Sequence, residues 1–252
     1  MSKASLANAT APTVTASTTT LKRLDVSWSA VPNASSYTVK LYAATGTGDA
    51  LATVSTTGTT RALIASDFNF DDLTLYTVSV QAIGGTNYQD STESSKTSAR
   101  TRGLPQSITV DASGVVDATG SWIDGTWYTA TLGTSRVTPT AIQNQMGSAN
   151  ATLTTAGAIT VSSAVTATNA SRSLTINSTA GDVTVTGSVS VAGNFAISGA
   201  AVTINANQST TNGGNITITP SGDFTGTGAL NSAGSLTAVS YTHLTLPTNR
   251  EV

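Results

Sequence analysis

The sequence predicts an all-β protein in two parts, an antiparallel sandwich followed by a right-handed parallel β-helix-like repeat region. The 252 residues include 49 Thr and 32 Ser but only 4 Lys and 2 Glu, a balance that favours strands over helices. Apolar and polar residues alternate with period two in the first part, which is typical of half-buried strands. The second part repeats short apolar-Thr-apolar triplets, which are typical of a stacked repeat.

Charge density separates the two parts. Residues 1–136 carry 19 charged side chains, whereas residues 137–239 carry only three. A short stretch with Gly and Pro at residues 100–105 is typical of a linker. We therefore expect a disordered N-terminus (1–10), a sandwich (11–102), a linker and capping segment (103–147), β-helical repeats (148–239) and a non-native tail (240–252).

Alternation in the sandwich segment is strongest in three stretches, at residues 24–28, 37–41 and 76–82, with polar or Gly-rich turns between them. The run Leu24-x-Val26-x-Trp28 continuing to Tyr37-x-Val39 resembles the B and C strands of fibronectin type III domains. The run Phe70-x-x-x-Thr74-x-Tyr76 continuing to Ala82 is similar to the E–F corner and F strand of that family. The resemblance covers residues 11–102.

This resemblance implies structural roles for three aromatic residues. Trp28 and Tyr37 are expected in the core between two sheets, and the Tyr76 hydroxyl is expected to reach a backbone group upstream, as in a tyrosine corner. The family usually has Pro four residues before the corner tyrosine, where this chain has Asp72, so we expect a looser turn.

Two stretches of the sandwich segment are candidates for binding. Residues 84–90 correspond to an F–G loop, and we expect Asn87 and an exposed Tyr88 to contact a protein or glycan partner there. The run from Asp67 to Asp72 matches the first oxygen positions of a calcium loop. It has Asp72 where that loop needs Gly and Val78 where it needs Glu, so a solvated turn is the favoured interpretation.

The repeat region holds eight triplets, and the residues Leu153, Leu174, Phe195 and Ile216 are each 21 positions apart. Strands this short cannot bury a face alone, but they can when each coil stacks on the previous one, as in a parallel β-helix. A β-sandwich array is the competing architecture. Thr-x-Thr pairs in the triplets suggest a hydroxyl array of the ice-binding kind, which irregular spacing would split among faces.

The sequence pattern of residues 173–185 (SLTINSTAGDVTV) and 213–218 (GGNITI) resembles the repeats of filamentous-haemagglutinin-like bacterial adhesins. Before them, Trp122 and Trp127 are expected to close one end of the stack. A short helix is expected to start at an N-cap Thr138 and to stop at Gly147. Three carboxylates precede it, Asp111, Asp117 and Asp124, and scattered turn residues are a more economical interpretation of them than acid–base catalysis.

Several functions are disfavoured by composition. The chain has no Cys, and its single His lies in the tail at residues 240–252, which looks like translated adapter read-through. We therefore expect no catalytic residues, no cofactor and no metal site. A net charge of −2 argues against nucleic-acid binding, and no apolar run is long enough for membrane insertion.

The first twenty residues have no apolar segment, so we expect no signal peptide here and expect the sequence to be a piece of a longer protein. Its function is expected to be that of a non-catalytic fragment of a large secreted or cell-surface bacterial adhesin, acting as spacer, stalk and contact module. The alternative is an accessory, non-catalytic region of a secreted carbohydrate-active enzyme.

Overall fold

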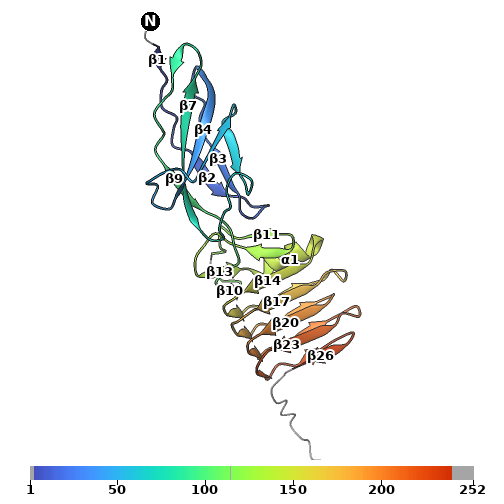
Figure 1. Cartoon of the computed structure of the whole chain (residues 1–252). Helices are drawn as coiled ribbons and strands as arrows, with labels where there is room; N and C mark the ends of the chain where they lie inside the picture. The colour runs from blue at the N-terminus through green and yellow to red at the C-terminus, as the bar shows by residue number, and fades with distance from the viewer. Residues whose placement is uncertain (1–2, 114, 240–252) are drawn as a thin grey trace, which may run out of the picture. The chain divides into compact units, whose positions relative to one another are not determined.

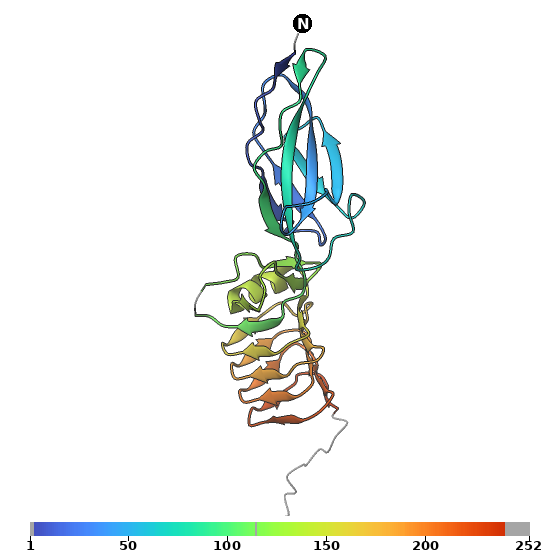
Figure 2. The same cartoon turned by 60° about the vertical axis from the view of Figure 1, so that its left-hand side comes forward.

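The regular secondary structure is almost entirely β, with 46% of the residues in strands and 4% in helix. A computed structural model describes residues 3–113 and 115–239. The chain divides after Gly103 into two compact units, which are here called the first unit and the solenoid. Figures 1 and 2 show the strands of each.

The first unit consists of two antiparallel sheets and a small parallel pair. The three-stranded sheet has the order β2 (Thr13–Ala16), β3 (Leu24–Ser27), β6 (Thr60–Leu63). The four-stranded sheet has the order β5 (Ala52–Thr56), β4 (Ala34–Ala43), β7 (Leu75–Gly84), β9 (Thr97–Arg100). Inward residues of both sheets form one hydrophobic core, which includes the three alternating stretches predicted from the sequence.

The N-terminal segment is ordered from Ala4 onward, so the expectation of disorder over residues 1–10 is wrong for the part described. Strand β1 (Ala4–Ser5) pairs in parallel with β8 (Tyr88–Gln89). Leu6 and Ala9 are buried against the core of the first unit. Burial of these two apolar side chains, together with a covered strand edge, offsets the entropy of ordering the segment.

The solenoid has about five turns, and its strands form three sheets in which successive turns pair in parallel. The six-stranded sheet is β13 (Thr134–Val137), β10 (Ser107–Val110), β15 (Ile159–Val161), β18 (Val183–Val185), β21 (Val202–Ile204), β24 (Phe224–Gly226). The seven-stranded sheet is β11 (Ser121–Ile123), β12 (Thr126–Tyr128), β14 (Ala151–Thr155), β17 (Leu174–Ser178), β20 (Phe195–Gly199), β23 (Ile216–Pro220), β26 (Leu236–Ala238). The four-stranded sheet is β16 (Val165–Ala167), β19 (Val189–Val191), β22 (Gln208–Thr210), β25 (Leu230–Asn231).

Parallel pairing rules out the competing sandwich array for the repeats and confirms the stacked architecture. One detail of the prediction is wrong. Leu153 pairs with Ile176, and Leu174 pairs with Ala151, so the first step of this column is 23 residues, not 21. A shift by two residues keeps every side chain on the same face of a strand, and the triplet pattern therefore could not distinguish the two registers.

Turns of the solenoid stack so closely that some of them exclude a side chain. A Cβ on Gly181 would lie 2.4 Å from the carbonyl carbon of Gly157, and one on Gly214 would lie 2.2 Å from the carbonyl oxygen of Gly193. Asn side chains bridge other turns, since Asn194 Oδ1 accepts a hydrogen bond of 3.0 Å from the Asn215 backbone N–H. The recurring Gly and Asn of the turns are thus explained by contacts between turns.

One end of the solenoid is covered by a hairpin and a helix. Strands β11 and β12 are antiparallel, and β12 continues the parallel stack through β14. The helix α1 (Pro139–Ser148) packs on β16, with Ile142 and Met146 buried beneath it. Thr138 is its N-cap, as predicted, and accepts from the Ala141 N–H at 3.2 Å. The helix extends through Gly147, which was expected to end it, and its C-cap is Ala149.

The helix α1 has ten residues. Within residues 3–113 and 115–239, no helix is both long and apolar enough to cross a membrane. The tail at residues 240–252, including His243, lies outside the described residues.

Candidate functional sites

The loop predicted to bind a partner is partly built into the fold. Tyr88 lies in β8 opposite Ala4 and packs half-buried against the core of the first unit, so it is less exposed than expected. Asn87 is exposed at the tip of the loop. The loop is held at its base, where the Asp90 carboxylate accepts from the Gly84 N–H at 2.8 Å. A contact role for Asn87 and Tyr88 stays a prediction.

The three aromatic residues with expected structural roles are all buried. Trp28 and Tyr37 meet edge to face, with ring centroids 5.4 Å apart. The Tyr37 hydroxyl accepts from the Val31 N–H at 2.7 Å, and the Tyr76 hydroxyl accepts from the Asp71 N–H at 3.0 Å. Because each tyrosine hydroxyl is anchored to the backbone, these rings stabilise the fold and are not free to bind a ligand.

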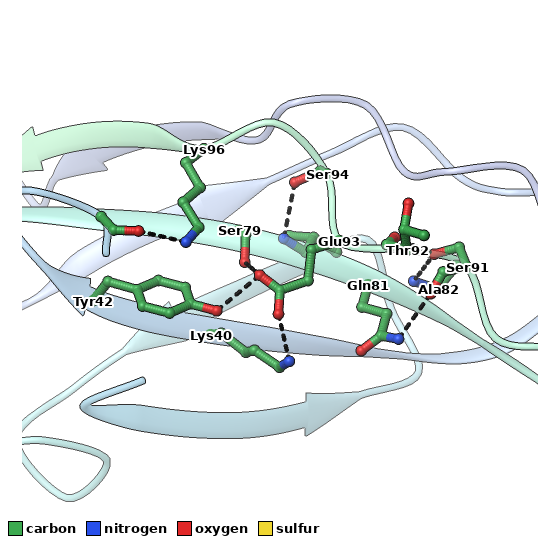
Figure 3. A network of polar contacts seen from close by, with 12 residues as sticks. Lys40, Tyr42, Ser79, Gln81, Ala82, Ser91, Thr92, Glu93, Ser94 and Lys96 are labelled. Carbon is green, nitrogen blue, oxygen red and sulfur yellow. Dashed lines mark hydrogen bonds and ion pairs between the residues drawn. The ribbon is translucent and has the colours of Figure 1, made fainter. Parts of the chain in front are cut away.

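A polar cluster on the four-stranded sheet of the first unit was not found from the sequence (Figure 3). Glu93 accepts from Lys40 Nζ at 2.5 Å, from the Tyr42 hydroxyl at 2.8 Å and from the Ser79 hydroxyl at 2.8 Å. Lys96 Nζ lies 3.7 Å from the centre of the Tyr42 ring. Lys40 and Glu93 are 53 residues apart. The pairing of β4 with β7 and an antiparallel bridge between Gln81 and Glu93 bring them together.

The protonation of this cluster suits a clamp better than acid–base chemistry. Burial alone would raise the pKa of Glu93, but the hydrogen bonds from Lys40, Tyr42 and Ser79 outweigh it and lower the pKa to about 2. The hydrogen bond to Glu93 raises the pKa of Lys40 above its ordinary value. Both groups therefore keep their charges near neutral pH and exchange no proton there.

The acidic run at residues 67–72 links two turns, at residues 65–67 and 72–73, and its Phe70 is buried in the core. Asp67 pairs with Arg61 at 2.7 Å and also accepts from the Ile64 N–H at 3.0 Å. Among the described residues, no group of three or more His, Cys, Asp or Glu side chains is placed to hold a metal ion. The Asp67 carboxylate is largely buried and engaged by these two protein groups, so it is less solvated than the turn interpretation expected.

The three carboxylates before the helix lie in different surroundings. Asp111 pairs with Arg136 at 2.5 Å. Asp117 accepts from the hydroxyls of Thr129, Ser135 and Thr119, with the Ser135 contact at 2.7 Å. Burial would raise the pKa of Asp117, but these hydroxyl donors hold it below its ordinary value. Asp124 is an exposed turn residue with φ of 49°. The contacts of Asp111 and Asp117 fix loops of the cap.

Outward threonines form columns on more than one face of the solenoid. Thr152 and Thr217 lie on strands of the seven-stranded sheet, whereas Thr184 lies on the six-stranded sheet. The longest column runs along the six-stranded sheet through Thr109, Thr160, Thr184, Thr203 and Thr225. The Thr-x-Thr pairs are therefore split among faces, as their irregular spacing suggested.

A shallow, open hollow of about 500 Å³ lies at the capped end of the solenoid. It is lined by residues of the β11–β12 hairpin and of helix α1: Gly120, Ser121, Trp122, Trp127, Ala141, Asn144 and Gln145. Trp122 is half-buried and meets the buried Trp127 edge to face, with ring centroids 5.2 Å apart. From the sequence, both tryptophans were expected only to close the stack.

A second hollow, of about 370 Å³, lies on the outer face of the three-stranded sheet. Its two guanidinium groups are already engaged, because Arg23 pairs with Asp25 at 2.7 Å and Arg61 pairs with Asp67 at 2.7 Å. This hollow therefore offers less unused binding capacity than the uncharged one at the cap.

Comparison with known proteins gives no family assignment. No protein-family model and no curated protein matches the chain. The functional argument consequently depends on the geometry of the two units.

Proposed function

We propose that this chain is a non-catalytic segment of a large secreted or cell-surface bacterial adhesin-like protein, in which it acts as a spacer and contact module. The observation that carries the proposal is the unbroken parallel pairing of the solenoid, from β10 and β14 through to β24 and β26. Each turn adds one strand spacing of about 4.8 Å to the stack. A stack of this kind can be lengthened by repetition without a new core, which is what a stalk requires.

The backbone of the solenoid supports a mechanical role. Hydrogen bonds between turns run along the stack, as from the Ile159 N–H to the Asp182 carbonyl at 2.9 Å and from the Val183 N–H to the Ala201 carbonyl at 2.8 Å. Side chains from successive turns share one continuous apolar core. Bending one turn against the next would break several of these contacts together, so the stack holds a defined length.

We further infer that the first unit is a fibronectin type III-like domain. Support comes from the strand order of its two sheets, β2-β3-β6 and β5-β4-β7-β9, from the buried Trp28 and from the Tyr76 hydroxyl bonded to the upstream backbone. In the proposed protein this unit is a spacer or contact module, and its exposed loop residue Asn87 is a candidate contact. An extracellular location is part of the same proposal.

The spacer role is tested by lengthening the stack. The chain has no Cys, so Thr109→Cys and Thr225→Cys place two spin labels specifically on one column of the six-stranded sheet. Duplicating residues 195–215, one full turn, should lengthen the distance between the labels by about 4.8 Å, measured by pulsed electron spin resonance. An unchanged distance would contradict a stack that is extended by repetition.

The contact role is tested with beads that carry the whole chain. We expect these beads to adhere to cultured epithelial cells more than beads carrying an unrelated all-β protein of similar net charge. Equal adhesion by both kinds of bead would contradict the contact role while leaving the spacer role to the label experiment.

A further inference from the structure

We propose that the hollow at the capped end of the solenoid is a binding site for a neutral saccharide, with Trp122 as the stacking platform. The seven residues that line the hollow are all uncharged. They combine aromatic surface from the β11–β12 hairpin with amide groups from helix α1. A sugar has the matching chemistry, because its ring presents C–H groups on one face and hydroxyls around its edge.

Trp122 is held in a fixed orientation before any ligand binds. It lies on β11, the edge strand of the seven-stranded sheet, directly opposite Trp127 on β12. Trp127 is buried, and its Nε1–H donates to the Ser135 hydroxyl at 2.9 Å. The Trp122 ring rests against this anchored indole, so stacking a ligand on it costs little side-chain entropy.

Polar groups around the indole provide hydrogen-bonding capacity. Asn144 is exposed on α1, and the neighbouring Gln145 is held by a bond of 3.0 Å from its Nε2 to the Asn150 carbonyl. The Ser121 hydroxyl oxygen is buried and has no hydrogen-bond partner in the part of the chain that the structure describes. That oxygen is shielded from solvent, so Asn144 is the polar group that a sugar in the hollow can reach directly.

These features favour a saccharide over a protein segment. A protein partner of comparable affinity would need a larger apolar surface around the aromatic anchor. Here a single half-buried indole is surrounded by amides, a hydroxyl and a glycine backbone. The absence of charged groups from the lining argues for a neutral sugar over a sulfated or uronic one.

The test uses the whole chain and a panel of neutral hexasaccharides: cellohexaose, laminarihexaose, chitohexaose and mannohexaose. Trp28 lies in the core of the first unit, so a change in tryptophan emission on adding sugar reports chiefly on Trp122 and Trp127 at the hollow. We expect at least one of these sugars to change the emission and to release heat in calorimetry at millimolar concentration. An anionic heparin hexasaccharide should bind more weakly than that sugar.

Variants locate the binding. Trp122→Ala should weaken it by about tenfold or more, since it removes the platform. Asn144→Ala changes an exposed helix residue that the fold does not need and should weaken binding about three- to tenfold. Gln143→Ala, on the same helix but outside the hollow, is the matched control and should leave binding unchanged.

Two results would overturn the proposal: no binding of any hexasaccharide in the panel, or binding that both Trp122→Ala and Asn144→Ala leave intact. A tighter response to heparin than to every neutral sugar would also contradict it. The site does not depend on the spacer role, which such results would leave standing.

Discussion

Each unit has its own hydrophobic core, but the two units hold their strands together differently. In the first unit, long antiparallel strands such as β4 and β7 pair across some forty residues of sequence, and unique side chains fill the core, among them Trp28 and Phe70. In the solenoid, short strands pair with their equivalents one turn away, and Val, Ile and Leu recur at equivalent places. The first unit is specified by individual residues, and the solenoid by repetition.

Polar residues follow the same division. The first unit has a clamp that occurs once, the Glu93 cluster, which joins β4 to the segment after β8. The solenoid instead uses small contacts in series, such as the Gly193–Gly214 approach and the Asn194–Asn215 bond. Loss of a unique residue should therefore affect its own unit, whereas loss of a repeated contact should be limited to adjacent turns.

The largest effect is expected from emptying each core. Phe70 and Phe195 are almost completely buried, one in each unit. Phe70→Ala and Phe195→Ala should each cost about 3–5 kcal/mol of unfolding free energy, through lost burial and a cavity. In calorimetry of the whole chain, Phe70→Ala should lower only the transition of the first unit, and Phe195→Ala only that of the solenoid. A shift of both transitions by either variant would show that the units unfold as one.

Glycine substitutions compare the closely stacked turns of the solenoid with the exposed surface of helix α1. Gly214→Ala would place a Cβ 2.2 Å from the Gly193 carbonyl oxygen, and we expect a loss of about 1–3 kcal/mol from the overpacked turns. Gly147→Ala is the matched control, because nothing lies within 4 Å of its Cβ position in helix α1. That change should raise stability by about 0.5–1 kcal/mol. Guanidinium unfolding measures both, and equal signs would contradict the stacking explanation.

Sequence patterns predicted the repeated part of the fold better than its exceptions. All eight triplets lie in strands with their apolar residues inward. Strand β22 was missed because its inward residues, Gln208 and Thr210, are polar. Gln208 is buried and bonds to the Ala206 carbonyl at 2.6 Å and the Val189 N–H at 3.1 Å. Such burial depends on partners in the neighbouring turn, which a period-two pattern does not show.

The candidate sites were harder to predict than the strands for the same reason. The Glu93 cluster joins residues of β4 and β7 with a segment beyond β8, and only the sheet register brings them within bonding distance. The hollow beside Trp122 needs both the hairpin and helix α1 in place. From the sequence, Trp122 was a candidate for the cap alone, because nothing local indicates that its ring borders a hollow. Asn87 and Tyr88 were selected by loop position, and the strand that covers Tyr88 came from a segment expected to be disordered.

The Glu93 cluster predicts a pH dependence for the first unit. The pKa of Glu93 is about 2 in the folded protein against an ordinary 4.5, so its contribution is fully present above pH 4.5 and is lost as the pH falls through 2. Because the pair is partly exposed, we expect Glu93→Gln to cost only about 1 kcal/mol at neutral pH. The difference between the parent and variant, measured by urea unfolding, should shrink toward pH 2. A difference that stays constant with pH would refute the ionic origin.

The smallest effect is expected from loss of one hydrogen bond between asparagines of adjacent turns. Asn194→Ala removes the acceptor of the Asn215 N–H, and since this bond is exposed we expect a loss of about 0.5–1 kcal/mol. Asn177→Ala is the control and should stay within about 0.5 kcal/mol of the parent. Its side chain accepts from the rotatable Ser198 hydroxyl on the outer face and from no other group among the described residues.

Amide hydrogen exchange would locate the Asn194 effect. The Asn215 amide should exchange faster in Asn194→Ala and at the parent rate in Asn177→Ala, with the first unit unaffected in both. If instead amides throughout the solenoid exchanged faster, the turns would be coupled over the whole stack. Stability would then come from the length of the array and not from contacts between adjacent turns.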